Sequence, residues 1–305
     1  MNIALILSGI GVCLYSITLV ICITMLILIC IRIRPLKSNV SILLTCNTYF
    51  NSLLVSSIML LMYSYTLRGN LDSRLSFGGQ WCEIRTYLTH VCFCSLYYSF
   101  VLQAIFRLFR IIFYKYKILQ SFGVFLIAIM FQWVLSFLCI LPNLLLNDFQ
   151  YLPTEYNCWI AFENIRGLIL VLITIFNNPL SIIFTIYTQI IRYTRRSTQI
   201  QQRRKNSNKR DLIILKRIVI LVFIVVGIGL PTAGIVLTYM ITKYVVPFAY
   251  HIQGLSISLG VLVESISLIF ITPQIQDIFR WNQARVYPIE TRVATVAQQN
   301  KQDKK

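Results

Sequence analysis

Residues 81–110 read WCEIRTYLTHVCFCSLYYSFVLQAIFRLFR, and this stretch decides the architecture of the chain. It contains no acid after Glu83 and stays apolar and aromatic for more than twenty residues before it reaches Arg107 and Arg110. A helix of about 20 apolar residues crosses the hydrocarbon core of a bilayer. We therefore expect a membrane-spanning helix with Cys82 at one end and guanidinium groups at the other.

The composition of the whole chain is that of an integral membrane protein. Of its 305 residues, 57% are hydrophobic and only 12% are charged, whereas soluble domains are about 25% charged. The net charge of +18 could suggest nucleic-acid binding, but the basic residues gather between apolar runs, as they do in cytoplasmic loops. We therefore expect membrane lipid as a partner and no nucleic acid.

Seven apolar runs are long enough to cross a membrane. They cover residues 3–31, 39–66, 82–113, 118–145, 167–191, 212–241 and 247–272. The connectors are short, so the sequence predicts an all-α bundle of seven transmembrane helices. Residues 1–285 form one membrane domain in this interpretation, and the polar residues 286–305 form a disordered cytoplasmic tail.

The basic residues also predict the orientation of the bundle. Of the 28 Lys and Arg residues, 23 lie at the ends of runs one, three and five, in the connectors after them, at the start of run six, or after the last run. Cytoplasmic segments carry such an excess, so the N-terminus is expected outside the cell and the C-terminus inside. The segment QDIFRWNQAR at 276–285 is predicted to lie on the membrane as a short amphipathic eighth helix.

Two of the nine cysteines lie at a helix mouth or in a loop, both on the predicted extracellular side. Cys82 opens the third run, and Cys158 lies in the connector between runs four and five. Because that compartment is oxidising, a Cys82–Cys158 disulfide is predicted, the alternative being two free thiols.

Together these features resemble the rhodopsin-like G-protein-coupled receptors, of which the chain looks like a divergent member. That family has an arginine 25 positions after the cysteine of helix three, and Arg107 stands at this distance from Cys82. Other positions of the family's pattern, in helices four to seven, are matched by Trp133, Pro179, Tyr187, Asp211, Pro231 and Pro273. The resemblance covers about residues 5–285. It implies a plasma-membrane receptor that couples an extracellular ligand to a heterotrimeric G protein.

The chain also departs from the family's pattern. The family's Asp-Arg-Tyr reads Phe106-Arg107-Leu108, Asn51 replaces the aspartate of helix two, and Gly229 replaces the tryptophan near the proline of helix six. The resemblance therefore gives no support for the family's sodium site or for its aromatic switch below the ligand.

The resemblance implies an activation switch at the cytoplasmic end. Arg107 and Asp211 would pair and hold helices three and six together, and Tyr187 would approach Arg107 once helix six has moved. Pro231 and Pro273 would let their helices bend. The structural alternatives are an Arg107 that extends to the membrane interface and a Tyr187 that belongs to an interfacial aromatic belt.

The candidate ligand pocket lies in the outer half of the bundle. Helix three offers Thr89, His90 and Tyr97 there, and Glu264 is an ionisable residue deep in the last run. Glu264 could be a ligand counter-ion or a neutral acid that is hydrogen-bonded to a neighbour such as Ser265. Thr89 stands where amine receptors carry an aspartate, so an amine anchored at that position is not expected.

No metal site, cofactor or catalytic group is expected, so the sequence does not predict an enzyme. Two other functions stay open. A seven-helix transporter or ligand-gated channel would need more buried charge along a path than Glu264 supplies. A sensory receptor that signals without G proteins is the second alternative.

Overall fold

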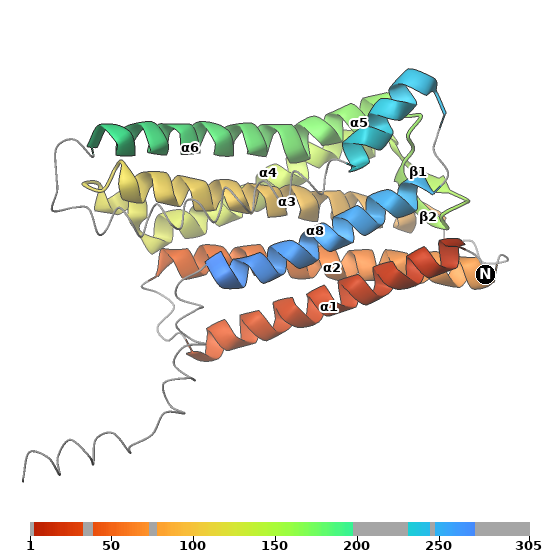
Figure 1. Ribbon diagram of the computed structural model, residues 1–305, viewed down its shortest axis with the longest axis horizontal. Helices are drawn as coiled ribbons and strands as arrows, with labels where there is room; N and C mark the ends of the chain where they lie inside the picture. The colour runs from red at the N-terminus through yellow and green to blue at the C-terminus, as the bar shows by residue number, and fades with distance from the viewer. Residues whose placement is uncertain (1–2, 33–38, 73–77, 198–230, 245–247, 272–305) are drawn as a thin grey trace, which may run out of the picture.

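The computed structural model describes residues 3–32, 39–72, 78–197, 231–244 and 248–271. Six helices within these ranges are long and apolar enough to cross a membrane (Figure 1). Five are α1 (Ile3–Arg32), α2 (Val40–Leu71), α3 (Gln80–Ile111), α4 (Phe122–Leu145) and α8 (Ala249–Ile271). The sixth is a composite of α5 (Ile165–Val171), the π-helical turn η3 (Leu172–Asn177) and α6 (Asn178–Ser197).

The remaining predicted span, 212–241, is described only from Pro231, where a helix of residues Pro231–Thr242 begins. The rest of that run lies outside the described residues, as do Asp211, Pro273, the predicted eighth helix and the tail. The structure therefore supports an all-helical membrane protein with six described spans, and the seventh span and the orientation stay predictions.

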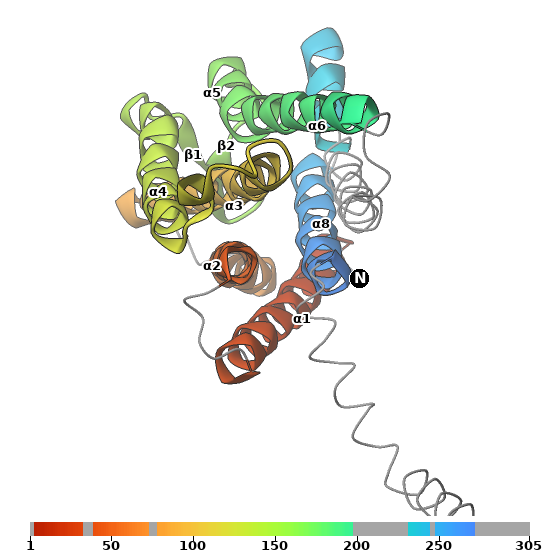
Figure 2. The same cartoon turned by 90° about the vertical axis from the view of Figure 1, so that its left-hand side faces the viewer.

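The long helices run side by side along the long axis of the molecule, with α3 in the middle of the bundle (Figures 1 and 2). Helices α2, α4 and α6 all pack against α3. In the most apolar part of α3, 56% of the residues are buried, against 22% in α4. Residues 81–110 lie within α3 and thus belong to the central helix.

Helix α4 shows how these helices divide their faces between lipid and protein. Its buried positions form one helical stripe that includes Gln132, Ser136 and Asn143, while Ile127 and Phe131 on the other face are exposed. A soluble helix would bury the apolar face. Here the exposed apolar face suits lipid, because lipid tails solvate such side chains without cost.

Polar side chains join the helices inside the bundle. Asn47 Nδ2 of α2 donates to Gln132 Oε1 of α4 at 3.0 Å, and Gln132 Nε2 donates to the Ser95 carbonyl of α3 at 2.7 Å. Thr48 Oγ1 of α2 lies 3.0 Å from Ser99 Oγ of α3. Such interhelical hydrogen bonds stabilise membrane bundles, in which the hydrophobic effect does not drive helix association.

Tyr63 of α2 is held between two glycines on neighbouring helices. A Cβ atom on Gly11 of α1 would lie 2.3 Å from the Tyr63 ring, and one on Gly254 of α8 would lie 1.8 Å from its hydroxyl oxygen. The Tyr15 ring of α1 stacks beside Tyr63, with 5.5 Å between the centroids. The missing side chains at both glycines let three helices meet around one tyrosine.

Two short elements complete the fold. A 3-10 turn, η2 (Lys117–Gln120), precedes α4, so α4 begins at Phe122 instead of at the start of its apolar run. A hairpin of β1 (Phe149–Leu152) and β2 (Asn157–Ile160) connects α4 to α5. The hairpin lies at the same end of the bundle as the beginning of α1 (Figure 1).

Candidate ligand-binding site

The hairpin is bonded covalently to the central helix. Cys158 of β2 forms a disulfide with Cys82 in the first turn of α3, with 5.6 Å between the Cα atoms. The predicted disulfide is thereby confirmed. Thr86 Oγ1 of α3 also donates to the Cys158 carbonyl at 2.8 Å, so β2 cannot move far from α3.

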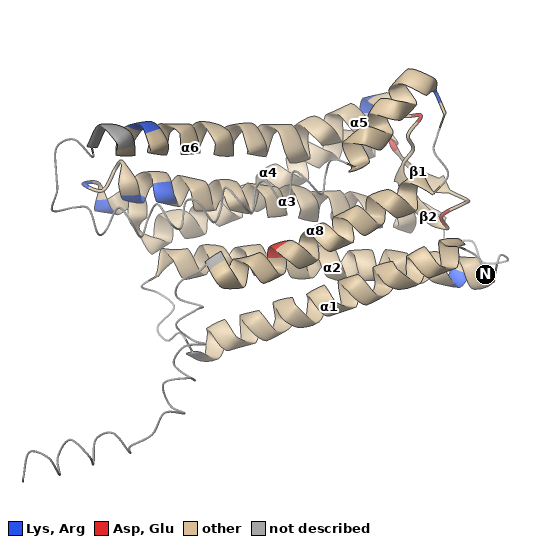
Figure 3. Ribbon diagram, viewed as in Figure 1, with Lys and Arg blue, Asp and Glu red and all other residues tan. Residues whose placement is uncertain are grey.

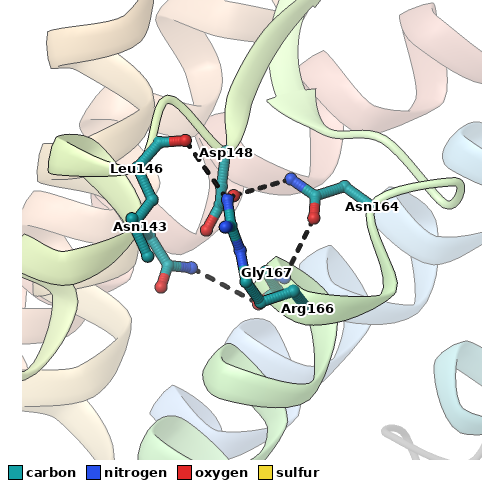
Figure 4. Close-up of polar contacts among 6 residues, drawn as sticks. All are labelled: Asn143, Leu146, Asp148, Asn164, Arg166 and Gly167. Atoms are coloured by element: carbon teal, nitrogen blue, oxygen red, sulfur yellow. Dashed lines mark hydrogen bonds and ion pairs between the residues drawn. The ribbon is translucent and has the colours of Figure 1, made fainter.

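A buried carboxylate fixes the two ends of the segment that contains the hairpin (Figure 4). Asp148, which is fully buried, accepts hydrogen bonds from Arg166 Nη2 at 2.6 Å and from Asn164 Nδ2 at 2.8 Å. Asn143 of α4 donates to the Gly167 carbonyl of α5 at 3.3 Å. These contacts bring the end of α4 and the start of α5 together, so the hairpin between them is held at both bases.

A cavity in the half of the bundle nearer the hairpin, called here the inner cavity, contains about 710 Å³ of empty space, including its opening. Its walls come from α3, β2, α5, η3, the helix Pro231–Thr242 and α8. The lining residues are His90, Phe93, Leu96, Tyr97, Trp159, Val171, Ile175, Phe176, Thr232, Gln253, Ile257, Gly260, Val261 and Glu264.

His90 joins α3 to the hairpin above this cavity. Its Nδ1 lies 2.8 Å from the Thr86 carbonyl, which can only accept, so Nδ1 carries a proton and donates. The His90 ring packs 4.7 Å from the Trp159 ring and 5.1 Å from the Phe149 ring. His90 therefore positions Trp159, which lines the cavity.

The predicted pocket residues Tyr97 and Glu264 also line the inner cavity, whereas Thr89 does not. The Tyr97 ring packs edge-on against Phe176 of η3, with 4.9 Å between the centroids. Thr89 is fully buried against α2, where its hydroxyl lies 3.5 Å from Met62 Sδ. Its position on α3 turns it away from the cavity.

Glu264 is the only acid of α8 and lies in the second half of that helix. Its side chain is buried, and its Oε1 accepts a hydrogen bond from Ser52 Oγ of α2 at 3.2 Å. The partner expected from the sequence, Ser265, instead lies with its Oγ 3.5 Å from Cys22 Sγ of α1. Glu264 thus contacts α2 and also lines the cavity.

A second space, called here the outer cavity, lies between α2, the hairpin and the start of α8 and contains about 490 Å³ including its opening. Trp159 and Gln253 line both cavities and so form the partition between them. His251 Nδ1 lies 3.0 Å from Glu155 Oε2, and His251 Nε2 lies 3.4 Å from Ser8 Oγ. These contacts hold the hairpin to α8 and α1.

Comparison with known protein families gives one assignment. The profile of the family described as 7 transmembrane receptor (rhodopsin family) matches residues 23–262, well over half of the chain. The chain belongs to this family. None of the individually curated proteins is significantly similar to it.

The end of α3 far from the hairpin carries Arg107, the arginine of the predicted switch. Arg107 lies in the last turns of α3, close enough to Tyr187 of α6 for its charge to act on that hydroxyl. The Tyr187 hydroxyl is buried and has no hydrogen-bond partner within the described ranges. Phe106, which replaces the family's acid, packs edge-on against Phe125 of α4, with 5.3 Å between the ring centroids.

Several residues of the receptor's site were not predicted from the sequence. Trp159 follows Cys158 directly, so a tryptophan beside a disulfide-bonded cysteine was an available signal. Gln253 gave no such signal. Glu155 and His251 gave none either, because the two residues of this pair are far apart in the chain. Among the described residues, no three His, Cys, Asp or Glu side chains gather in a way that could hold a metal ion.

Proposed function

We propose that this receptor binds an extracellular ligand in the inner cavity and activates a heterotrimeric G protein on the cytoplasmic side of the plasma membrane. The observation that carries the proposal is the inner cavity itself, in a member of the rhodopsin family, beneath a hairpin that a disulfide ties to α3. A largely apolar lining with a few polar groups, here His90, Gln253 and Glu264, is typical of a small-molecule site.

The orientation in this proposal follows from charge. The acids Asp148, Glu155 and Glu163 lie at the hairpin end, while Arg107, Arg110, Lys115 and Lys117 lie at the opposite end of the bundle (Figure 3). Because cytoplasmic loops are rich in Lys and Arg, we place the hairpin outside the cell and the end of α3 inside. The N-terminus is then extracellular.

Ligand binding would act through the elements that line the cavity. Thr232 belongs to the helix Pro231–Thr242, and Val261 and Glu264 belong to α8, whereas His90 and Tyr97 belong to α3. A ligand that binds more tightly to one arrangement of these helices favours that arrangement. The favoured one would have the cytoplasmic end of helix six moved away from α3, which opens a cleft for the G protein.

At the cytoplasmic end of α3 we assign the switch to Arg107. In the resting receptor Arg107 would pair with Asp211, and in the active receptor the Tyr187 hydroxyl would face the arginine. The burial of Tyr187 beside Arg107 supports the second contact. Pro231 and Pro273 would supply the bends that let helices six and seven move.

Agonist-stimulated nucleotide exchange on purified G proteins tests this function. The purified receptor in lipid nanodiscs is screened against a ligand library, and exchange is compared between wild type, Arg107→Ala and Arg110→Ala. We expect exchange to be lost in Arg107→Ala and retained in Arg110→Ala, whose arginine is exposed at the same end of α3. Ligand-dependent ion current without any G protein would overturn the proposal in favour of a channel.

A further inference from the structure

The wall of the inner cavity contains one carboxylate and no Lys or Arg among its described residues. The carboxylate is that of Glu264, whose residue is only 3% exposed. An ionisable side chain buried in a membrane protein is costly unless another group compensates its charge. Within the described ranges no Lys or Arg forms an ion pair with it.

The groups that face Glu264 do not supply a positive charge. Cys22 of α1, Tyr49 of α2 and Tyr97 of α3 lie within electrostatic range of Glu264, and each is either neutral or an anion. Ser52 offers one hydroxyl hydrogen, and its oxygen lies 3.2 Å from Glu264 Oε1 and 3.1 Å from the Thr48 carbonyl. A single hydrogen cannot serve both acceptors fully, so the carboxylate is left with room for a further donor.

Glu264 is the last residue of α8 to line the cavity. On α8 the lining runs from Gln253 to Glu264, a rise of about 16 Å at 1.5 Å per residue. Between these two residues the walls are mainly apolar or aromatic, with Phe93, Trp159 and Phe176 among them. A bare metal ion would leave this space unused, whereas an organic cation would fill it, and aromatic faces attract organic cations.

We propose that the inner cavity binds an organic amine. Its protonated nitrogen pairs with Glu264 beside Ser52, and its aliphatic or aromatic body lies against Phe93, Trp159 and Phe176. This inference rests on the proposed function only in taking the inner cavity as the ligand site. The acid is supplied by α8, since the α3 position where amine receptors carry an aspartate holds Thr89, which is buried against α2.

Matched pairs of amine and alcohol test the charge requirement directly. Tryptamine is compared with tryptophol and octylamine with octanol, because each pair differs mainly in the charged nitrogen. Binding to the purified receptor in nanodiscs is measured by isothermal titration and by the shift in Tm. We expect at least one amine to bind wild type at least tenfold more tightly than its alcohol, and Glu264→Gln to remove this preference.

Three further variants identify the group that is responsible. Glu163→Gln, which changes an exposed acid outside both cavities, should bind amines as wild type does. Glu264→Asp keeps the charge but withdraws it by one methylene, and should retain part of the preference. Ser52→Ala should weaken amine binding about threefold to tenfold, and it keeps the test available if Glu264→Gln does not fold.

Three outcomes would overturn the inference. The first is equal binding of the amines to wild type and to a folded Glu264→Gln variant, and the second is no binding of any amine. The third is stabilisation of wild type by sodium chloride but not by N-methylglucamine chloride, lost in Glu264→Gln and without amine binding, because Glu264 would then hold only an inorganic cation.

The same materials separate this inference from the proposed function. Nucleotide exchange driven by a ligand without a charged nitrogen would support the receptor function and reject the amine. Amine binding that depends on Glu264, without exchange on any G protein, would support the amine and reject G-protein coupling.

Discussion

The two ends of this bundle are held together by different kinds of interaction. At the hairpin end, a disulfide, a buried carboxylate with two side-chain donors and the Glu155–His251 pair connect separate elements of the chain. At the end that contains Arg107, the described contacts are mainly apolar, those of Val40, Leu44, Phe106 and Phe125. Single hydrogen bonds from Gln103 to Thr48 and from Gln120 to the Phe109 carbonyl add to them.

The difference has a physical consequence. A disulfide fixes the distance between its two cysteines. A buried hydrogen bond is lost when its donor and acceptor move apart, which leaves a buried polar group unsatisfied. Contacts between aromatic and aliphatic side chains are individually weak and can be exchanged for similar ones. The hairpin end is therefore suited to keep a ligand site in shape, and the other end is suited to rearrange.

Removal of the disulfide should have the largest effect on stability. Cys82→Ser should destabilise the receptor by about 2–5 kcal/mol, the usual cost of losing a native disulfide, and should reduce both surface expression and Tm. Cys139→Ser is the matched control, because Cys139 is a partly buried free thiol in α4. Equal losses from the two variants would show that the covalent bond does not distinguish the hairpin end.

The packing of Tyr63 should give the next largest effect. Gly254→Ala places a methyl group 1.8 Å from the Tyr63 hydroxyl oxygen, and we expect a destabilisation of about 1–3 kcal/mol, as in other overpacked cores. Tyr63→Phe removes that oxygen, so the double variant should regain part of the lost Tm. Additive losses in the double variant would contradict a direct clash.

The Asp148 cluster should contribute a similar or smaller amount. Asp148→Ala removes the oxygen that accepts hydrogen bonds from the Arg166 and Asn164 side chains. We expect a loss of about 1–3 kcal/mol, measured as a lower Tm, with exposed Glu163→Gln as the control. An unchanged Tm would show that the disulfide alone holds the hairpin.

The smallest effect on stability is expected at the opposite end. Tyr187→Phe removes a hydroxyl that has no hydrogen-bond partner within the described ranges, so the free energy of unfolding should change by less than about 0.5 kcal/mol. Agonist-stimulated nucleotide exchange should nevertheless fall, because the active state loses a contact with Arg107. Tyr193→Phe, at an exposed tyrosine of α6, is the control. A loss of Tm as large as that of Asp148→Ala would remove the distinction between the two ends.

The helices could be predicted from the sequence because a membrane requires long apolar runs. Six of the seven runs correspond to spans described almost from end to end, and α4 begins four residues late because η2 occupies the start of its run. The hairpin was not predicted, since FQYL and NCWI are only four residues long and mix polar with apolar residues.

The site was only partly predictable, for a reason of geometry. Cys82, Cys158 and Glu264 stood out because a cysteine at a helix mouth and an acid in a span are unusual. The rotation of α3 about its axis could not be read from its apolar pattern, and this rotation puts Tyr97 in the cavity and Thr89 against α2. Ser52 lies 212 residues from Glu264, so no local pattern connects them.

The π-helical turn η3 divides one membrane-spanning segment into two rotational phases. One extra residue in a helix turns everything beyond it by about 100°. Val171 before the turn and Ile175 and Phe176 within it line the inner cavity, whereas beyond it Ile183, Ile186, Tyr187 and Ile190 form the buried stripe of α6. A single-residue insertion or deletion at this turn would therefore rotate the cavity-lining residues of the segment by about 100° relative to the stripe of α6 that packs against α3.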